Sequence, residues 1–121
     1  MATMLVVDDE REITQVLADF LTSRGHDVSE AQSGTQALAL AHQRHFDIIF
    51  LDILMPGLDG NETLRQLKME SPRTIIIMIS GTSDEDTALK SLELGAFDFI
   101  RKPFEFSRID TVVALGLAAL S

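Results

Sequence analysis

Five short apolar stretches alternate with longer stretches in which apolar residues recur at helical spacing. The strand-like stretches are residues 3–8, 26–31, 46–52, 74–80 and 96–102. Helical patterns follow them, the first through Ile13, Val16, Leu17, Phe20 and Leu21 and the last from about residue 105 to 120. This rhythm predicts an α/β fold in which right-handed crossovers build a doubly wound, five-stranded parallel sheet with helices on both faces.

The third strand-like stretch ends on a carboxylate. Residues 48–51 are large and apolar, as a central strand covered on both faces requires, and Asp52 follows them directly. A lone carboxylate at the end of a buried strand is costly unless another group compensates it. Asp52 therefore either caps the following turn or takes part in chemistry where strand ends meet.

Polar residues end three of the other strand-like stretches as well. Asp8 ends the first, with Asp9 and Glu10 next, whereas Ser80 ends the fourth and Lys102 the fifth. Because all strands of a parallel sheet point the same way, these ends meet at one edge, where open α/β folds place their ligands. The sequence therefore predicts one site that contains Asp8, Asp9, Asp52, Ser80 and Lys102.

The predicted site suits a hard divalent cation. Carboxylates brought together repel one another, and the chain has no cysteine and no convergent histidines, so the available donors are oxygens. That donor set favours Mg²⁺, or Mn²⁺ in its place, over zinc or copper. A carboxylate such as Asp52 can itself be the nucleophile in phosphoryl transfer and form an aspartyl phosphate. Lys102 would then supply an ammonium, and Ser80 a hydroxyl, to neutralise the developing charge.

Four motifs at these strand ends resemble the receiver domain of two-component response regulators. They are VVDDE (6–10), LDILMPGLDG (51–60), MISG (78–81) and GAFDFIRKPF (95–104), and the match covers essentially the whole chain. The resemblance implies a flavodoxin-like fold with strand order 2-1-3-4-5, formed by residues 1–121 as a single receiver domain. It also implies a phosphoacceptor signalling switch rather than an enzyme that turns over a separate substrate.

The resemblance gives each acidic residue of the site a role. Asp52 would accept a phosphoryl group from a sensor histidine kinase or a phosphotransfer protein. Asp9 would bind Mg²⁺ directly and Asp8 partly through water, with Asp52 and the backbone carbonyl of Leu54 as further ligands. Because Leu54 cannot orient an attacking water by hydrogen bonding, we expect slow to moderate self-dephosphorylation; Thr82 is the second position that tunes this rate in the family.

The remaining residues of the site would carry the switch. Lys102 would pair with the phosphoryl group, and the Lys102-Pro103 bond is expected to be cis. Ser80 would be the switch hydroxyl and Phe99 the aromatic side chain that turns inward behind it, as phosphorylation shifts the population toward a second conformer. Phe99 stands where many relatives carry Tyr, so packing alone would hold it inward. Gly81 replaces a frequent Ala and should make its loop more mobile.

Two other functions compete with the phosphorylation switch. A pseudo-receiver would be a protein-interaction module that works without phosphorylation, although the intact set of Asp8, Asp9, Asp52 and Lys102 speaks against it. An Asp-nucleophile phosphatase of the haloacid dehalogenase kind uses a similar set. That class usually places a second Asp two residues after the nucleophile, where this chain has Leu54.

Composition limits the partners and the location that we expect. The chain has 121 residues, a single-domain length, and its net charge of −9 argues against direct binding to nucleic acid. The longest apolar tract, residues 112–120, is far shorter than the ~20 residues that span a bilayer. We therefore expect a cytoplasmic protein with no nucleic-acid or membrane partner, either a stand-alone receiver or the first domain of a longer regulator.

The last predicted helix has more apolar surface than one packing face requires. Its inward face is predicted to contain Ile109, Val113, Gly116, Leu117 and Leu120, and Val112, Leu115 and Ala119 add apolar surface beside it. One hypothesis is that this helix, with the fourth helix and the fifth strand, packs against a second receiver as a homodimer or leads into a linker. The alternative is that the helix end is exposed only because the chain ends there.

Overall fold

Strands and helices alternate along the whole of this computed structural model, which describes residues 1–81 and 85–121. The elements are β1 (Thr3–Val7), α1 (Arg11–Ser23), β2 (Asp27–Ala31), α2 (Gly34–Gln43), β3 (Ile48–Asp52), α3 (Gly60–Glu70), β4 (Ile75–Ser80), α4 (Glu85–Glu93), β5 (Asp98–Arg101) and α5 (Phe106–Leu120). The strands form one sheet in the order β2-β1-β3-β4-β5, and each pairing is parallel. The predicted fold class and strand order are therefore confirmed.

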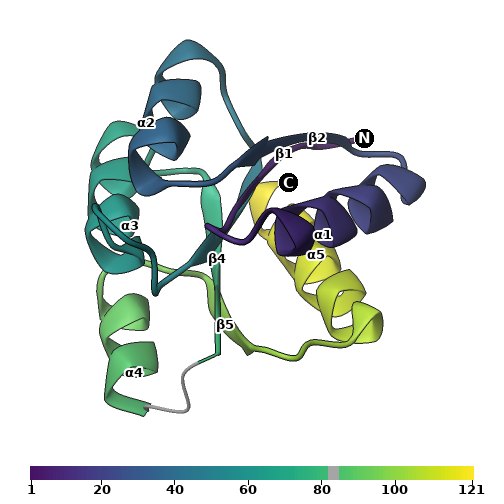
Figure 1. Cartoon of the computed structure of the whole chain (residues 1–121). Coiled ribbons are helices and arrows are strands. Elements are labelled where there is room, and N and C mark those ends of the chain that lie inside the picture. Colours follow the sequence, from purple (N-terminus) through teal and green to yellow (C-terminus); the bar gives the residue numbers. More distant parts are fainter. Residues whose placement is uncertain (82–84) are drawn as a thin grey trace.

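The helices lie in two layers, one on each face of the sheet. Figure 1 shows α1 and α5 together on one face and α2, α3 and α4 on the other. From β1, the strand β2 is added on one side in the sheet, whereas β3, β4 and β5 are added in turn on the other side. Because the crossovers are right-handed, this reversal places α1 and α3 on opposite faces of the sheet. The strand order reverses between β1 and β3, and open α/β sheets bind ligands at the carboxyl ends of the strands at such a point.

Side chains alternate along the central strands and supply a separate core to each helical layer. In β1, Leu5 and Val7 face the core beneath α2 and α3, whereas Met4 and Val6 face the core beneath α1 and α5. Every residue of β3 is buried, including Asp52. The more polar β2 lies at an edge of the sheet, as its sequence predicts. The carboxyl end of β3 is thus held rigidly between two packed layers.

The observed strands are slightly shorter than the predicted stretches. Asp52 and Ser80 are the last residues of β3 and β4, as expected, whereas Asp8 and Lys102 lie one residue beyond β1 and β5. Thr82, the second predicted tuning residue, lies outside the described residues.

The prediction of which α5 residues face outward was wrong for Val112. Val112 was expected to add exposed apolar surface, but its side chain is completely buried in the core together with Ile109 and Val113. A close approach of α5 to the sheet explains the difference, since Gly116 packs against the side chains of Ile75 and Ile48. Leu115 does face outward, with 53% of its surface exposed. Within residues 1–81 and 85–121, no helix combines the length and the apolar character needed to cross a membrane.

Candidate functional site

The predicted site residues come together at the carboxyl edge of the sheet. Asp8 follows β1 directly, and its N–H donates to the Ala31 carbonyl of β2 at 3.1 Å. Asp52 ends the neighbouring strand β3, and Ser80 ends β4. The Lys102 N–H donates to the Ser80 carbonyl at 2.9 Å, which continues the β4–β5 ladder by one residue. Strand pairing therefore brings all of these residues to one edge.

The Lys102 ammonium lies between two buried carboxylates. Its Nζ is 2.6 Å from Asp8 Oδ2 and 3.6 Å from Asp52 Oδ2. The side chains of Asp8 and Asp52 are 3% and 5% exposed, so water screens these contacts weakly. Burial lowers the pKa of Lys102, but the hydrogen bond to Asp8 and the charge of Asp52 outweigh it and leave this pKa raised. Lys102 is therefore a firmly charged member of the site.

Asp52 is much harder to ionise than an exposed aspartate. Burial raises the pKa of Asp52 from 3.8 to about 6, and the nearby Asp8 carboxylate acts in the same direction. The Lys102 ammonium and the Leu54 N–H, which donates to the Asp52 carboxylate, act in the opposite direction without cancelling the increase. Further positive charge at this edge would favour the ionised form of Asp52.

Three acids at the start of α1 could hold a metal ion. Asp8, Asp9 and Glu10 each offer a carboxylate oxygen, and these oxygens lie within 4.8 Å of one another. The Glu10 N–H also donates to Asp8 Oδ1 at 2.9 Å, which fixes the turn between β1 and α1. A donor set made only of oxygens fits a hard divalent cation such as Mg²⁺. The sequence placed Glu10 beside the site but gave it no role, because side-chain direction in a turn cannot be read from spacing.

The loop from β3 to α3, residues 53–59, brings Leu54 next to Asp52. Ile53 and Met55 are buried, whereas the Leu54 side chain is 63% exposed. Gly60 closes the loop because its N–H donates to the Ile53 carbonyl at 2.8 Å. A side chain at Gly60 would overlap the carbonyl of Asp52, so α3 can start here only with glycine.

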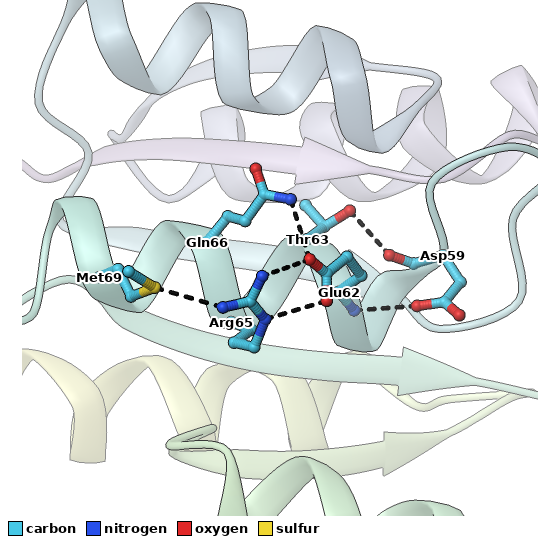
Figure 2. Close-up of polar contacts among 6 residues, drawn as sticks. All are labelled: Asp59, Glu62, Thr63, Arg65, Gln66 and Met69. Carbon is cyan, nitrogen blue, oxygen red and sulfur yellow. Dashed lines mark hydrogen bonds and ion pairs between the residues drawn. The ribbon is translucent and has the colours of Figure 1, made fainter.

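Asp59 caps α3 at the end of this loop. Its carboxylate accepts the Glu62 N–H at 2.9 Å, and its carbonyl accepts the Thr63 hydroxyl at 2.8 Å (Figure 2). Figure 2 also shows Arg65, which bridges the Glu62 carboxylate and the Met69 sulfur on the exposed side of the helix. Asp59 is therefore the N-cap residue of α3.

The two predicted switch residues lie in different environments. Ser80 is completely buried at the end of β4. Phe99 lies in β5 opposite Met78 and packs, partly buried, against the core beneath α2 and α3. The Lys102-Pro103 bond is cis, as the family resemblance implied.

An open apolar pocket of about 410 Å³ adjoins the site. It is lined by Ile13, Val16, Lys102, Pro103, Phe104 and Phe106. The Phe106 ring stacks on Phe20 of α1, with 4.2 Å between ring centroids, so α1 and the start of α5 form its two walls. Lys102 belongs to both the pocket and the acidic site, which places an apolar surface next to the carboxylates.

The sequence that forms this site also matches the model of a known family. The family model described as the response regulator receiver domain matches residues 4–114. The chain belongs to this family. As a receiver domain it is a module of two-component response regulators, which are generally signalling switches. Receiver domains usually bind Mg²⁺ at a cluster of acids, and here Asp8, Asp9 and Glu10 form such a cluster.

Similar curated proteins are longer regulators. The receiver domain is 38% identical to the nitrogen assimilation regulatory protein NtrX of Azorhizobium caulinodans over 119 residues, which cover 97% of this chain and 26% of that protein. It is 39% identical to the transcriptional regulatory protein ResD of Bacillus subtilis over 101 residues, or 84% of this chain and 42% of that one. The chain thus spans about a quarter to two fifths of the length of these relatives.

Solved receiver domains share the fold along nearly the whole chain. The receiver domain of NtrX from Brucella abortus superposes with a TM-score of 0.91 at 38% identity, covering 95% of this chain and 98% of that one. The BeF3-activated DrrB receiver domain gives a TM-score of 0.90 at 29% identity and covers 98% of each chain. The resemblance drawn from the four sequence motifs is therefore confirmed.

Proposed function

We propose that this receiver domain, residues 1–121, is a phosphoacceptor switch in which Asp52 takes a phosphoryl group from a histidine kinase or a phosphotransfer protein. The observation that carries the proposal is the Lys102 ammonium, which contacts both the Asp8 and the Asp52 carboxylates at the carboxyl edge of the sheet. Phosphoryl transfer depends mostly on positioning and charge neutralisation. A buried carboxylate held beside an ammonium and further acids supports both requirements.

The transfer uses Asp52 as the nucleophile. A carboxylate oxygen of Asp52 attacks the phosphorus of a phosphohistidine, so that a P–O bond forms while the P–N bond breaks. The electron pair of the broken bond returns to the imidazole nitrogen, which then takes up a proton. Because the pKa of Asp52 is about 6, the carboxylate is mainly ionised and nucleophilic above that pH. Lys102 faces the incoming phosphoryl oxygens and offsets their charge.

Asp8, Asp9, Asp52 and the Leu54 carbonyl are the proposed ligands of Mg²⁺, for which Mn²⁺ can substitute. When bound, the cation neutralises negative charge on the phosphoryl oxygens. The proximity of the Asp8 and Asp9 carboxylates supports their part in this ligand set, and the oxygen-only donors suit both ions.

The conformational change is proposed to pass through Ser80 and Phe99. The Ser80 hydroxyl moves to the phosphoryl oxygen, and the Phe99 ring turns further inward behind it. This change alters the face formed by α4, β5 and α5. Leu92 of α4 and Leu115 of α5 are exposed apolar side chains on these two helices. A second receiver or an output domain then binds this face in the phosphorylated state.

Intact-mass spectrometry tests the proposal directly. The native chain is incubated with acetyl phosphate and Mg²⁺, and the Asp52→Asn variant is treated in the same way. We expect one phosphoryl group on the native chain and none on the variant. Asp19→Asn, which removes an exposed carboxylate of α1, is the matched control and should still be phosphorylated.

Other outcomes would favour the competing functions. An adduct on Asp52→Asn would assign the acceptor to another residue. The absence of any adduct on the native chain, together with undetectable Mg²⁺ binding, would favour a pseudo-receiver. Steady turnover of a small phosphate ester would favour a phosphatase.

A further inference from the structure

The β3–α3 loop, residues 53–59, carries the backbone groups that surround the proposed phosphoacceptor. The Leu54 N–H donates to the Asp52 carboxylate, and the Leu54 carbonyl is a proposed Mg²⁺ ligand. Because the Leu54 side chain is mostly exposed, its packing cannot fix these backbone groups. Their position must depend on how the two ends of the loop are held.

The two ends are held in different ways. Ile53 and Met55 anchor the first end by burial in the core. At the second end the side chains of residues 56–59 are exposed or half-buried, so apolar packing contributes little there. The hydrogen bond from the Gly60 N–H to the Ile53 carbonyl joins the two ends of the loop. The position of Ile53 and Leu54 at the first end therefore depends on how the second end is held.

Thr63 holds the second end of the loop. Its hydroxyl donates to the Asp59 carbonyl at 2.8 Å, and its N–H donates to the same carbonyl at 3.0 Å. Figure 2 shows the hydroxyl directed from α3 toward the residue that ends the loop. Thr63 is completely buried, so water cannot replace this hydroxyl bond without a rearrangement.

Gly34, the first residue of α2, packs against the same place. A Cβ atom at this position would overlap the Thr63 hydroxyl and would lie 2.9 Å from the Leu58 carbonyl oxygen. A residue without a side chain therefore allows α2 to close onto both Thr63 and the loop. These contacts connect α2, through Thr63, to the loop that carries Leu54.

We propose that Thr63 and Gly34 are positioning residues of the phosphoacceptor site, because together they fix the β3–α3 loop and thereby the backbone of Leu54. The role of these residues in phosphoryl transfer rests on the proposed function. Their contacts with the loop do not depend on it. Neither residue touches the reacting groups, so each acts through the loop. Substitution of groups that support metal ligands typically weakens metal binding by about 10- to 100-fold.

Matched threonine variants test the proposal. Thr63→Val removes the hydroxyl and keeps the volume, and Thr63→Ser restores a hydroxyl. Thr74→Val is the control, because Thr74 is also buried and donates to a carbonyl, that of Phe46 at 2.9 Å, but lies at the opposite edge of the sheet. By calorimetry, we expect Thr63→Val to raise the Kd for Mg²⁺ about tenfold. Thr63→Ser and Thr74→Val should stay close to the native Kd.

A second readout requires neither metal nor phosphate. Amide hydrogen exchange at Gly60 in the metal-free protein reports whether the loop is closed. We expect faster exchange at Gly60 in Thr63→Val than in the native chain or in Thr74→Val. The inference would be overturned if Thr63→Val had the native exchange rate at Gly60 and the native Kd for Mg²⁺. It would also be overturned if Thr74→Val changed both quantities as much as Thr63→Val does.

The two proposals can fail separately. If the native chain accepts no phosphoryl group but Gly60 still exchanges faster in Thr63→Val alone, the proposed function fails and the loop contact stands. If Thr63→Val does not fold, Gly34→Ala displaces the loop from the side of α2. That variant should raise both the Gly60 exchange rate and the Kd for Mg²⁺, and native values for both would overturn the inference.

Discussion

Replacing Asp52 with asparagine should stabilise the fold at neutral and higher pH. Asparagine has nearly the same shape and can still accept the Leu54 N–H, but it carries no charge. The pKa of Asp52 is higher in the folded protein than in an exposed aspartate, so the folded state binds the proton more tightly. The contribution of Asp52 to stability is therefore fully present below pH 3.8 and is lost as the pH rises through about 6.

The size of the effect follows from the pKa. A rise from 3.8 to about 6 is roughly two units, and each unit corresponds to about 1.4 kcal/mol. Above pH 7, the ionised Asp52 therefore costs the folded protein about 3 kcal/mol relative to the protonated form. Because domains are typically stable by only about 5–15 kcal/mol, a difference of this size is easily measured.

Urea unfolding of the native chain and of Asp52→Asn, in the presence of EDTA, measures the difference. The chain has no Trp and no Tyr, so far-ultraviolet circular dichroism is a better probe than fluorescence. We expect the variant to be more stable by about 2–3 kcal/mol at pH 8 and the difference to disappear near pH 4. Asp19→Asn, at an exposed position, should show no such pH dependence.

One result would refute this reasoning. If Asp52→Asn were as stable as the native chain, or less stable, at pH 8 with an unchanged dependence on urea, the ionised carboxylate would not be a net cost to the fold. The contacts with Lys102 would then outweigh burial and repulsion by Asp8, contrary to the raised pKa of Asp52.

Two further predictions concern the neighbours of Asp52. Leu54→Asn places an amide that can orient water beside the acceptor, so loss of the phosphoryl group should become faster by about tenfold, a small part of what positioning can contribute. Decay of the phosphorylated mass measures this rate; rapid loss from the native chain with no change in the variant would contradict it. Lys102→Met removes a charge that lowers the pKa of Asp52, so this pKa should rise above about 6 in a carbon-13 carboxyl titration. An unchanged or lower pKa would show that Lys102 does not act on Asp52.

The fold could be predicted because it depends on local patterns. The alternation of strands and helices, the polar character of β2 and the buried run before Asp52 are all visible in the sequence. Parallel pairing then brings the strand ends together without knowledge of any side-chain contact. This is why the sequence could group Asp8, Asp52, Ser80 and Lys102 at one edge.

Features that depend on contact between helices and loops could not be predicted. The packing of Gly34 on Thr63 joins residues from different helices, and spacing within either helix contains no signal for it. Val112 was misplaced because a helix that is apolar most of the way round does not reveal which side meets the sheet. Similarly, nothing in the sequence indicates that the ammonium of Lys102 lies closer to Asp8 than to Asp52.

The order of the strands along the chain also decides when each charged residue of the site is synthesised. In the folded sheet, β3 pairs with the edge of β1 that β2 leaves free, and β4 and β5 each pair with the strand synthesised just before them. Lys102 follows the last of these strands, so a nascent chain that ends before it holds the Asp8 and Asp52 carboxylates without the ammonium that lies between them. The ammonium that balances the charge of the site is therefore synthesised after both carboxylates and after all five strands of the sheet.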